Sequence, residues 1–258
     1  MTTEDIDPSL WIRRYAKASD ADRRLVCFPH AGGSASFFHP LAQRFAADTD
    51  VVSLQYPGRQ DRRHEPLITD IGSYADRLTA VLTSMTDVPT VFFGHSMGAV
   101  LAFEVARRLE DRGAAIPSSL IVSGRRAPAT CRDEQVHRQD DQHIIAELKL
   151  LNGTGAQLFG DEEVMRMALP AIRGDYQAIE TYACAPRVTV RCAITVLVGR
   201  ADPKATLDES AAWRDHTTGD FRLKSFPGGH FFLSEHQSAV NGEIAAELGK
   251  LSPVPSQA

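Results

Sequence analysis

The most informative run of this chain is TVFFGHSMG, at residues 90–98. Its first four residues are β-branched or aromatic, which predicts a buried strand, and the apolar run after it predicts a helix. Between the two stands the pattern G-x-S-x-G, in which Gly94 and Gly98 leave room for the strand and the helix to approach each other. So tight a turn would hold Ser96 in a strained backbone conformation, with its hydroxyl projecting from the sheet. This context favours a nucleophilic serine over an ordinary strand–helix turn that happens to contain a serine.

Length, charge and cysteine content narrow the class of protein. The 258 residues can bury one full core, and since no repeat or linker divides them we expect a single domain over residues 1–258. The net charge of −5 gives no reason to expect a nucleic-acid or membrane partner. The four cysteines form no C-x-x-C pair and the N-terminus has no secretory signal, so we expect a cytoplasmic protein. Metal-binding and nucleotide-binding motifs do not occur, and we expect no metal and no cofactor.

Strand-like and helix-like segments alternate along most of the chain. Apolar strand runs occur at 25–28, 51–54, 90–93, 120–123 and 194–198, and residues 221–226 form the last expected strand. Helical spacing of apolar residues in the connections predicts an α/β fold, with a mostly parallel sheet and helices on both faces. The alternation stops at residues 125–187, where we expect short helices at 141–151, 161–173 and 176–182. A helical insertion between two core strands fits a lid over an active site.

Apolar side chains of this insertion are candidates for contact with a substrate. We select Phe159, Met165, Met167 and Leu169 for that role. The alternative is that such residues form the small core of the insertion itself. The pattern leaves open which residues do which.

A serine hydroxyl needs a base, and the base needs a group that orients it. In the fold that the serine turn indicates, the order along the chain is serine, acid, histidine, and active residues follow the carboxyl ends of parallel strands. His230 directly follows the last strand, and Asp202 follows the strand before it. His30 and His95 precede Ser96 and break this order. We therefore predict a triad of Ser96, Asp202 and His230.

Two backbone N–H groups are predicted to bind the negative charge that develops on a substrate oxygen. One belongs to Met97, at the start of the helix after the serine. The other belongs to Ala31, in the loop PHAGGS at residues 29–34, because a glycine-rich loop after a strand can point its N–H groups into a site. The alternative for this loop is a plain strand–helix turn, since apolar residues follow it at helical spacing.

Five longer motifs carry a resemblance to a known family. They are FPHAGGSASFFHPLA (28–42), QYPGRQDRRHEP (55–66), FFGHSMGAVLAFEVARRL (92–109), LPAIRGDYQAIETY (169–182) and FPGGHFFL (226–233). In this order they are similar to the type II thioesterases, the stand-alone editing enzymes of modular polyketide and nonribosomal peptide synthases, which have the α/β-hydrolase fold. The resemblance covers nearly the whole chain. It implies that the family's triad matches Ser96, Asp202 and His230, and that residues 125–187 cap an acyl chamber.

The resemblance also implies a substrate and a partner. The substrate would be an acyl thioester on the phosphopantetheine arm of an acyl or peptidyl carrier protein, and the enzyme, expected to be a monomer, would clear aberrant or stalled acyl groups. Carrier proteins are usually acidic, so basic residues are candidates for a docking surface. We select Arg59, Arg62, Arg63, Arg125 and Arg126. Two alternatives remain: a carboxylesterase or lipase of the same fold, and a catalytically silent module that binds acyl carriers.

Overall fold

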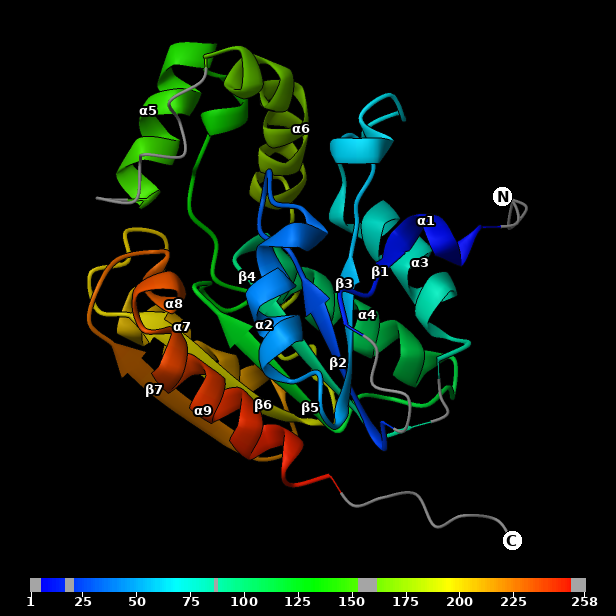
Figure 1. Ribbon diagram of the computed structural model, residues 1–258. Helices are drawn as coiled ribbons and strands as arrows, with labels where there is room; N and C mark the ends of the chain where they lie inside the picture. The colour runs from blue at the N-terminus through cyan, green and yellow to red at the C-terminus, as the bar shows by residue number, and fades with distance from the viewer. Residues whose placement is uncertain (1–5, 17–20, 86–87, 153–161, 252–258) are drawn as a thin grey trace, which may run out of the picture.

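The computed structural model describes residues 6–16, 21–85, 88–152 and 162–251. Its centre is a seven-stranded sheet in the order β1-β3-β2-β4-β5-β6-β7 (Figure 1). The strands are β1 (Ile12–Arg13), β2 (Arg23–Phe28), β3 (Thr49–Leu54), β4 (Thr90–His95), β5 (Ser119–Ser123), β6 (Ala193–Gly199) and β7 (Phe221–Phe226). Neighbouring strands are parallel except for β1 and β3, which run antiparallel. The predicted α/β fold is confirmed, and β1 is an addition, because two residues are too few to show a periodic pattern.

Helices cover both faces of the sheet, as the alternation predicts. On one face lie α3 (Ile71–Leu82) and α4 (Met97–Asp111), and on the other lie α2 (His39–Arg44), α8 (Phe232–Glu235) and α9 (Gln237–Leu248). Every residue of β5 is buried, because a strand in the middle of such a sheet is covered from both sides. Shorter helical segments are α1 (Pro8–Trp11), α7 (Leu207–Ala211), η1 (Ala35–Phe38), η2 (Gln60–Arg62), η3 (Val136–Arg138) and η5 (Ala212–His216).

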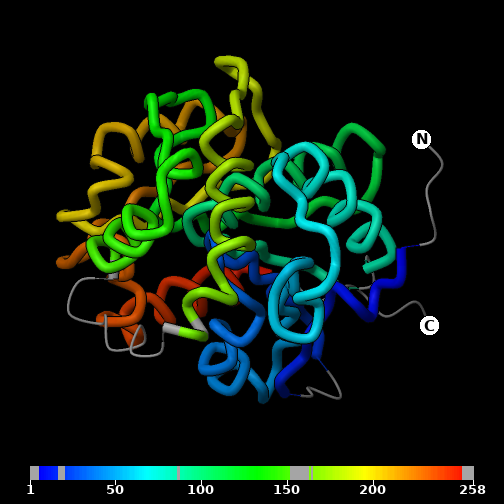
Figure 2. The backbone as a smooth tube through the Cα atoms, turned by 90° about the horizontal axis from the view of Figure 1, so that it is seen from above, coloured from blue at the N-terminus to red at the C-terminus, as the bar shows by residue number. Residues whose placement is uncertain are grey.

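Between β5 and β6 the chain leaves the sheet and forms α5 (Asp141–Asn152) and α6 (Glu162–Glu180). Both helices stand at the top of Figure 1, and in the view from above α6 crosses the centre of the molecule (Figure 2). The predicted break between residues 173 and 176 is wrong, because α6 continues through Pro170 and Gly174. Pro170 is exposed while one side of α6 is buried, so packing continues the helix past residues of poor helix propensity.

Candidate active site

Ser96 occupies the strained turn that the sequence predicts. Its backbone has φ 55° and ψ −117°, a conformation that residues with a side chain rarely adopt. Space requires both glycines: a Cβ on Gly94 would lie 2.2 Å from the carbonyl oxygen of Gly98, and a Cβ on Gly98 would lie 2.0 Å from the carbonyl oxygen of Phe28. The N–H of Ser96 donates to the carbonyl oxygen of Ser123 at 2.8 Å. The turn is thereby fixed between β4, α4 and the end of β5.

His230 and Asp202 meet at the same edge of the sheet. Asp202 follows β6 and His230 follows β7, and because these strands are parallel their carboxyl ends bring the two residues together. Nδ1 of His230 lies 2.9 Å and 3.0 Å from the two carboxylate oxygens of Asp202. The N–H of Lys204 donates a further hydrogen bond to Asp202 at 2.8 Å. Both side chains are buried, and this contact leaves Nε2 as the ring nitrogen available to a reacting hydroxyl.

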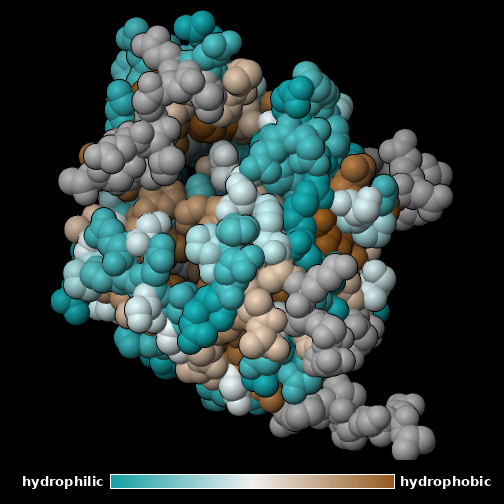
Figure 3. Space-filling model, in the orientation of Figure 1, coloured by the Kyte–Doolittle hydropathy of each residue, from teal (hydrophilic) through white to brown (hydrophobic). Residues whose placement is uncertain are grey.

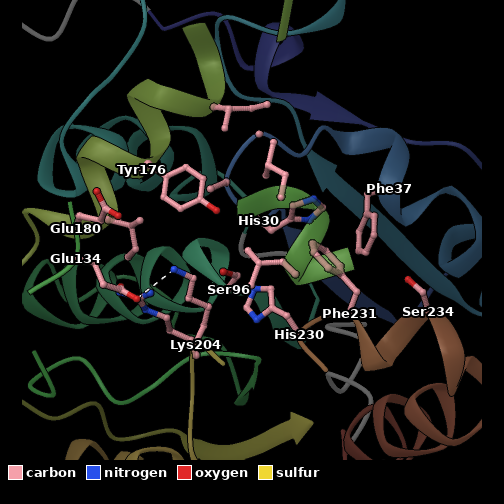
Figure 4. Close-up of a pocket in the computed structure, with 17 residues that line it drawn as sticks. His30, Phe37, Ser96, Glu134, Tyr176, Glu180, Lys204, His230, Phe231 and Ser234 are labelled. Carbon is pink, nitrogen blue, oxygen red and sulfur yellow. Dashed lines mark hydrogen bonds and ion pairs between the residues drawn. The ribbon is translucent and has the colours of Figure 1, made fainter. Parts of the chain in front are cut away.

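Ser96 and His230 line one cavity of about 290 Å³. Figure 4 shows the two side chains beside each other. Ala31 lines the same cavity, and Met97 is the first residue of α4, so its N–H has no acceptor within the helix. The structure therefore places the predicted nucleophile and the predicted base on one cavity, with Ala31 on its wall and Met97 next to Ser96 in the chain, while the two oxyanion donors stay a prediction.

Much of the apolar wall of this cavity comes from the insertion. Figure 3 shows an apolar recess below α5 and α6, on the side where α8 lies. The apolar side chains that α5 and α6 contribute are Leu148, Leu151, Ile172, Ile179 and the ring of Tyr176. A recess of this size and character suits a small acyl group.

The side chains selected from the insertion by sequence are not those that line the cavity. Met165 and Leu169 are buried in the small core between α5 and α6 and do not line the cavity, which is the alternative that the sequence left open. Met167 is wrong as a substrate contact, because the residue is 65% exposed and does not line the cavity. Phe159 lies outside the described residues. Helical spacing identifies an apolar side of a helix but does not say which other segment that side meets.

A buried carboxylate that the sequence analysis passed over holds the loop that contains Ala31. Asp175 of α6 is 1% exposed, and it accepts hydrogen bonds from the N–H of Gly32 and the hydroxyl of Tyr74, both at 2.8 Å. It also forms an ion pair with Arg59, whose Nε donates to the carbonyl oxygen of Gly33 at 2.9 Å. Asp175 and Arg59 thus hold two peptide groups of the loop, the one between Ala31 and Gly32 and the one that follows Gly33. Because the sequence analysis placed a break between the helices 161–173 and 176–182, Asp175 fell between two predicted helices and gave no sign that it would be buried.

Two histidines that break the triad order lie next to His230. The rings of His95 and His230 have centroids 5.0 Å apart, and Nδ1 of His95 lies 3.0 Å from Oγ of Ser123. Burial, and secondarily the proximity of His230, lowers the pKa of His95 well below its ordinary value of 6.5. The same causes lower the pKa of His30 to about 3. Both rings are therefore neutral at physiological pH, so they pack around the predicted base without adding positive charge.

The predicted docking set of arginines is wrong for four of its five members. Arg59, Arg62, Arg125 and Arg126 are between 3% and 8% exposed, so a protein partner cannot contact them as a surface patch. Arg62 stacks on the ring of Trp11 and pairs with Glu65, and Arg126 pairs with Glu134. Arg63 alone of the five is exposed. In sequence, a run of basic residues looks like a solvated surface. In the structure, Arg59, Arg62 and Arg126 are buried by contacts with Asp175, Trp11 and Lys204, which are distant in the chain.

Three observations bear on metal, membrane and redox chemistry. The described residues hold no group of three or more His, Cys, Asp or Glu side chains placed to bind a metal ion. Within the same ranges, no helix has the length and apolar character needed to span a bilayer. The four cysteines are all free.

Comparison with known proteins shows the family to which the chain belongs. The thioesterase domain family matches residues 23–248. A probable cadicidin biosynthesis thioesterase of Streptomyces griseus is 59% identical over 248 residues, which are 96% of this chain and 68% of that protein. Thioesterase PikA5 of Streptomyces venezuelae is 43% identical over 95% of this chain and 87% of its own length.

Two solved structures show the same family. The type II thioesterase BorB, from the borrelidin biosynthetic cluster, matches with a TM-score of 0.87 and 49% identity, over 96% of this chain and 100% of its own. The type II thioesterase YbtT, from the yersiniabactin pathway, matches with a TM-score of 0.77 and 32% identity, over 93% of this chain and 98% of its own. The chain therefore belongs to the thioesterase family, and within it to the type II thioesterases of the α/β-hydrolase fold.

Proposed function

We propose that this type II thioesterase hydrolyses acyl groups from the phosphopantetheine arm of acyl or peptidyl carrier proteins, with Ser96, His230 and Asp202 as its triad. Three of the relatives named above are described by the biosynthesis of cadicidin, the borrelidin biosynthetic cluster and the yersiniabactin NRPS/PKS pathway, which supports a role in editing a polyketide or nonribosomal peptide synthase. The observation that carries the proposal is one cavity lined by both Ser96 and His230, with the imidazole held by Asp202.

The mechanism follows from the positions of these groups. His230 takes the proton of the Ser96 hydroxyl while Oγ attacks the thioester carbonyl, and Asp202 stabilises the resulting imidazolium. The N–H groups of Ala31 and Met97 bind the oxyanion. When the tetrahedral intermediate collapses, the C–S bond breaks and the thiolate receives the proton from His230. Water, deprotonated by the same imidazole, then attacks the acyl-serine, which releases the acid and restores the hydroxyl.

The insertion has the position of a lid in this proposal. The helices α5 and α6 form part of the cavity wall opposite the sheet, so they would enclose the acyl group. The family match runs continuously across the insertion, which supports a single domain over residues 1–258. The four free cysteines fit a reducing cytoplasm, where we place the protein.

Hydrolysis of matched substrates tests the proposal. We expect release of acyl groups from carrier-bound phosphopantetheine, and at least tenfold lower kcat/KM on the corresponding oxyesters. Ser96→Ala should lower kcat by about 10⁴-fold or more. Ser234 lines the same cavity, so Ser234→Ala is a matched control that should stay within about twofold of wild type.

Two results would reject the assignment. Near wild-type turnover in Ser96→Ala would remove Ser96 from the mechanism. A preference for oxyesters would favour the carboxylesterase alternative, whereas binding of an acyl carrier without any turnover would favour the silent module. Labelling of wild type, but not of Ser96→Ala, by a fluorophosphonate would identify the nucleophile independently of the substrate.

A further inference from the structure

Lys204 holds the proposed catalytic acid through its backbone. Its N–H donates to Oδ1 of Asp202 at 2.8 Å, and Nδ1 of His230 lies 3.0 Å from the same oxygen. The N–H of Asp202 in turn donates to the carbonyl oxygen of Gly199, at the end of β6, at 3.1 Å. Two hydrogen bonds within one short loop therefore set the direction of the carboxylate, and a shift of Lys204 would change its contact with the imidazole.

The side chain of Lys204 contacts three segments of the insertion. Its Nζ pairs with Glu134, which precedes α5, at 3.1 Å, and with Glu147 of α5. It also lies 5.9 Å from the centre of the Tyr176 ring on α6, a distance at which a cation is attracted to an aromatic face. The side chain of Lys204 is 12% exposed and those of the two carboxylates are 16% and 19% exposed, so water screens these contacts little. Figure 4 shows the nitrogen of Lys204 turned toward Glu134.

The insertion also holds the backbone of this loop. Arg126 donates to the carbonyl oxygen of Lys204 at 3.2 Å, and Arg132 donates to the carbonyl oxygen of Pro203 at 2.7 Å. Among the described residues, the pair between Glu147 and Lys204 is the one ion pair that joins α5 to the chain outside the insertion. It is therefore the ion pair that α5 would break on moving away from the cavity.

We propose that Lys204 is a positioning residue, through which the closed lid keeps Asp202 aligned with His230. The inference rests on the proposed function, because it takes the triad and the lid from there, but it does not depend on which acyl group is bound. With α5 and α6 over the cavity, the insertion fixes the side chain of Lys204, and the N–H of the same residue orients the carboxylate.

Movement of the two helices would loosen this arrangement. Lys204 would keep Glu134 but would lose Glu147 and Tyr176. The loop after β6 would then be held less firmly, and Asp202 would stabilise the imidazolium less well. Because small errors in the geometry of catalytic groups lower rates strongly, the serine would be fully activated only under the closed lid.

Substitutions at both ends of the pair between Lys204 and Glu147 test the inference. Lys204→Met removes the charge and keeps most of the stem, Lys204→Arg keeps the charge, and Glu147→Gln removes the partner on α5. The double variant Lys204→Met/Glu147→Gln loses one charge of each sign. Asp141→Asn is the matched control, since it removes a carboxylate of the same helix whose partner, Arg173, belongs to the insertion itself.

The first measurement is the rate constant at which a small fluorophosphonate labels Ser96. It reports activation of the serine without an acyl group or a carrier protein, and it does not depend on how much of a variant is folded. We expect Lys204→Met and Glu147→Gln each to lower it about 10- to 100-fold, Lys204→Arg to recover most of it, and Asp141→Asn to leave it unchanged. On a pantetheine thioester, kcat should fall in parallel with little change in KM.

The double variant separates positioning from a simple effect of charge. Loss of a cation and loss of an anion near the triad act in opposite directions on the imidazolium, so charge effects alone would cancel and return the rate to that of wild type. Loss of positioning does not cancel. The double variant should be as slow as either single variant, because both substitutions break the same contact.

Proton NMR can observe the contact itself. The proton between Nδ1 of His230 and Asp202 should give a far-downfield resonance in wild type, identified by its absence from Asp202→Asn. We expect Lys204→Met and Glu147→Gln to broaden this resonance through faster exchange with water, and Asp141→Asn to leave it unchanged.

Wild-type labelling rates in Lys204→Met and Glu147→Gln would overturn the inference, and so would recovery of the rate in the double variant. An unchanged resonance in variants that are labelled slowly would also overturn it, because the effect would not pass through Asp202. If wild type is not labelled at all, the proposed triad fails and the inference fails with it. Wild-type labelling that both substitutions leave unchanged rejects the inference alone, so the two failures are distinguishable.

Discussion

Replacing Asp175 with asparagine tests whether the lid helix positions the loop that carries Ala31. Asp175 and Arg59 are 1% and 7% exposed, and removing one charge of a buried pair costs about 3–5 kcal/mol. Asparagine retains one acceptor oxygen, so either Gly32 or Tyr74 also loses its partner. For a protein of this size, about 2–4 °C per kcal/mol corresponds to a fall in Tm of about 6–20 °C.

Activity should fall as well, because Asp175 holds the N–H of Gly32, and Ala31, whose N–H is the proposed oxyanion donor, is the residue directly before it. If the loop shifts and this donor is lost, kcat should fall by about 10²-fold with little change in KM. The free energy of unfolding comes from urea titration followed by circular dichroism, and kcat and KM from thiol release at a temperature where the variant is folded.

The insertion offers a matched control for this substitution. Asp141 on α5 pairs with Arg173 on α6 at 2.6 Å, but its side chain is 61% exposed. Asp141→Asn should therefore cost less than about 1 kcal/mol and leave kcat unchanged. If Asp175→Asn matches this control in both unfolding free energy and kcat, the positioning role assigned to Asp175 is refuted.

Three further predictions concern the serine turn and acid stability. Ser96→Gly should abolish turnover yet raise the unfolding free energy by about 1 kcal/mol, because glycine tolerates φ 55°; lower stability in urea would contradict the strain. Gly98→Ala should cost about 3 kcal/mol in the same titration, since its Cβ would meet the carbonyl oxygen of Phe28; an unaffected midpoint would show that the turn can relax. Burial raises the pKa of Glu134, but Arg126 and Lys204 outweigh it and hold the pKa at about 2, below the ordinary 4.5. Its stabilisation is therefore present above pH 4.5 and is lost as the pH falls towards 2, so Glu134→Gln should flatten the loss of stability in that range, and a slope equal to that of wild type would exclude this role.

Most of the fold was predictable because its signals are local. Five of the seven strands contain apolar runs, and β7 shows the alternation of apolar and polar residues that is typical of a strand. The alternation of these strands with helices implies a parallel sheet. The serine turn was predictable for the same reason, since its glycines are required within five consecutive residues. The exceptions are β1, too short for a pattern, and the continuous course of α6 through Pro170 and Gly174, which depends on packing that local propensity does not record.

In the candidate site too, residues marked by local signals were predictable, and residues placed by long-range packing were not. Ser96, Asp202 and His230 could be selected because chain order and strand ends constrain them. The roles of the arginines could not, because burial of Arg59 depends on Asp175, 116 residues away in the chain. The cavity-lining residues of α5 and α6 were missed for a related reason: periodicity gives the apolar side of each helix, while the face turned to the cavity depends on where the helices stand over the sheet.

The helix α6 contacts both the active-site cavity and the loop that contains Ala31, so opening of the cavity by movement of α6 would affect both. It supplies Ile172, Tyr176 and Ile179 to the roof of the acyl chamber, and the same helix holds the peptide of Gly32 through Asp175. A rigid swing of the whole helix would therefore disturb the proposed oxyanion loop while the roof is raised. In such an open state an acyl-serine would be hydrolysed slowly, because the loop that carries the proposed oxyanion donor is displaced. Closing α6 over the cavity would therefore restore hydrolysis at the same time.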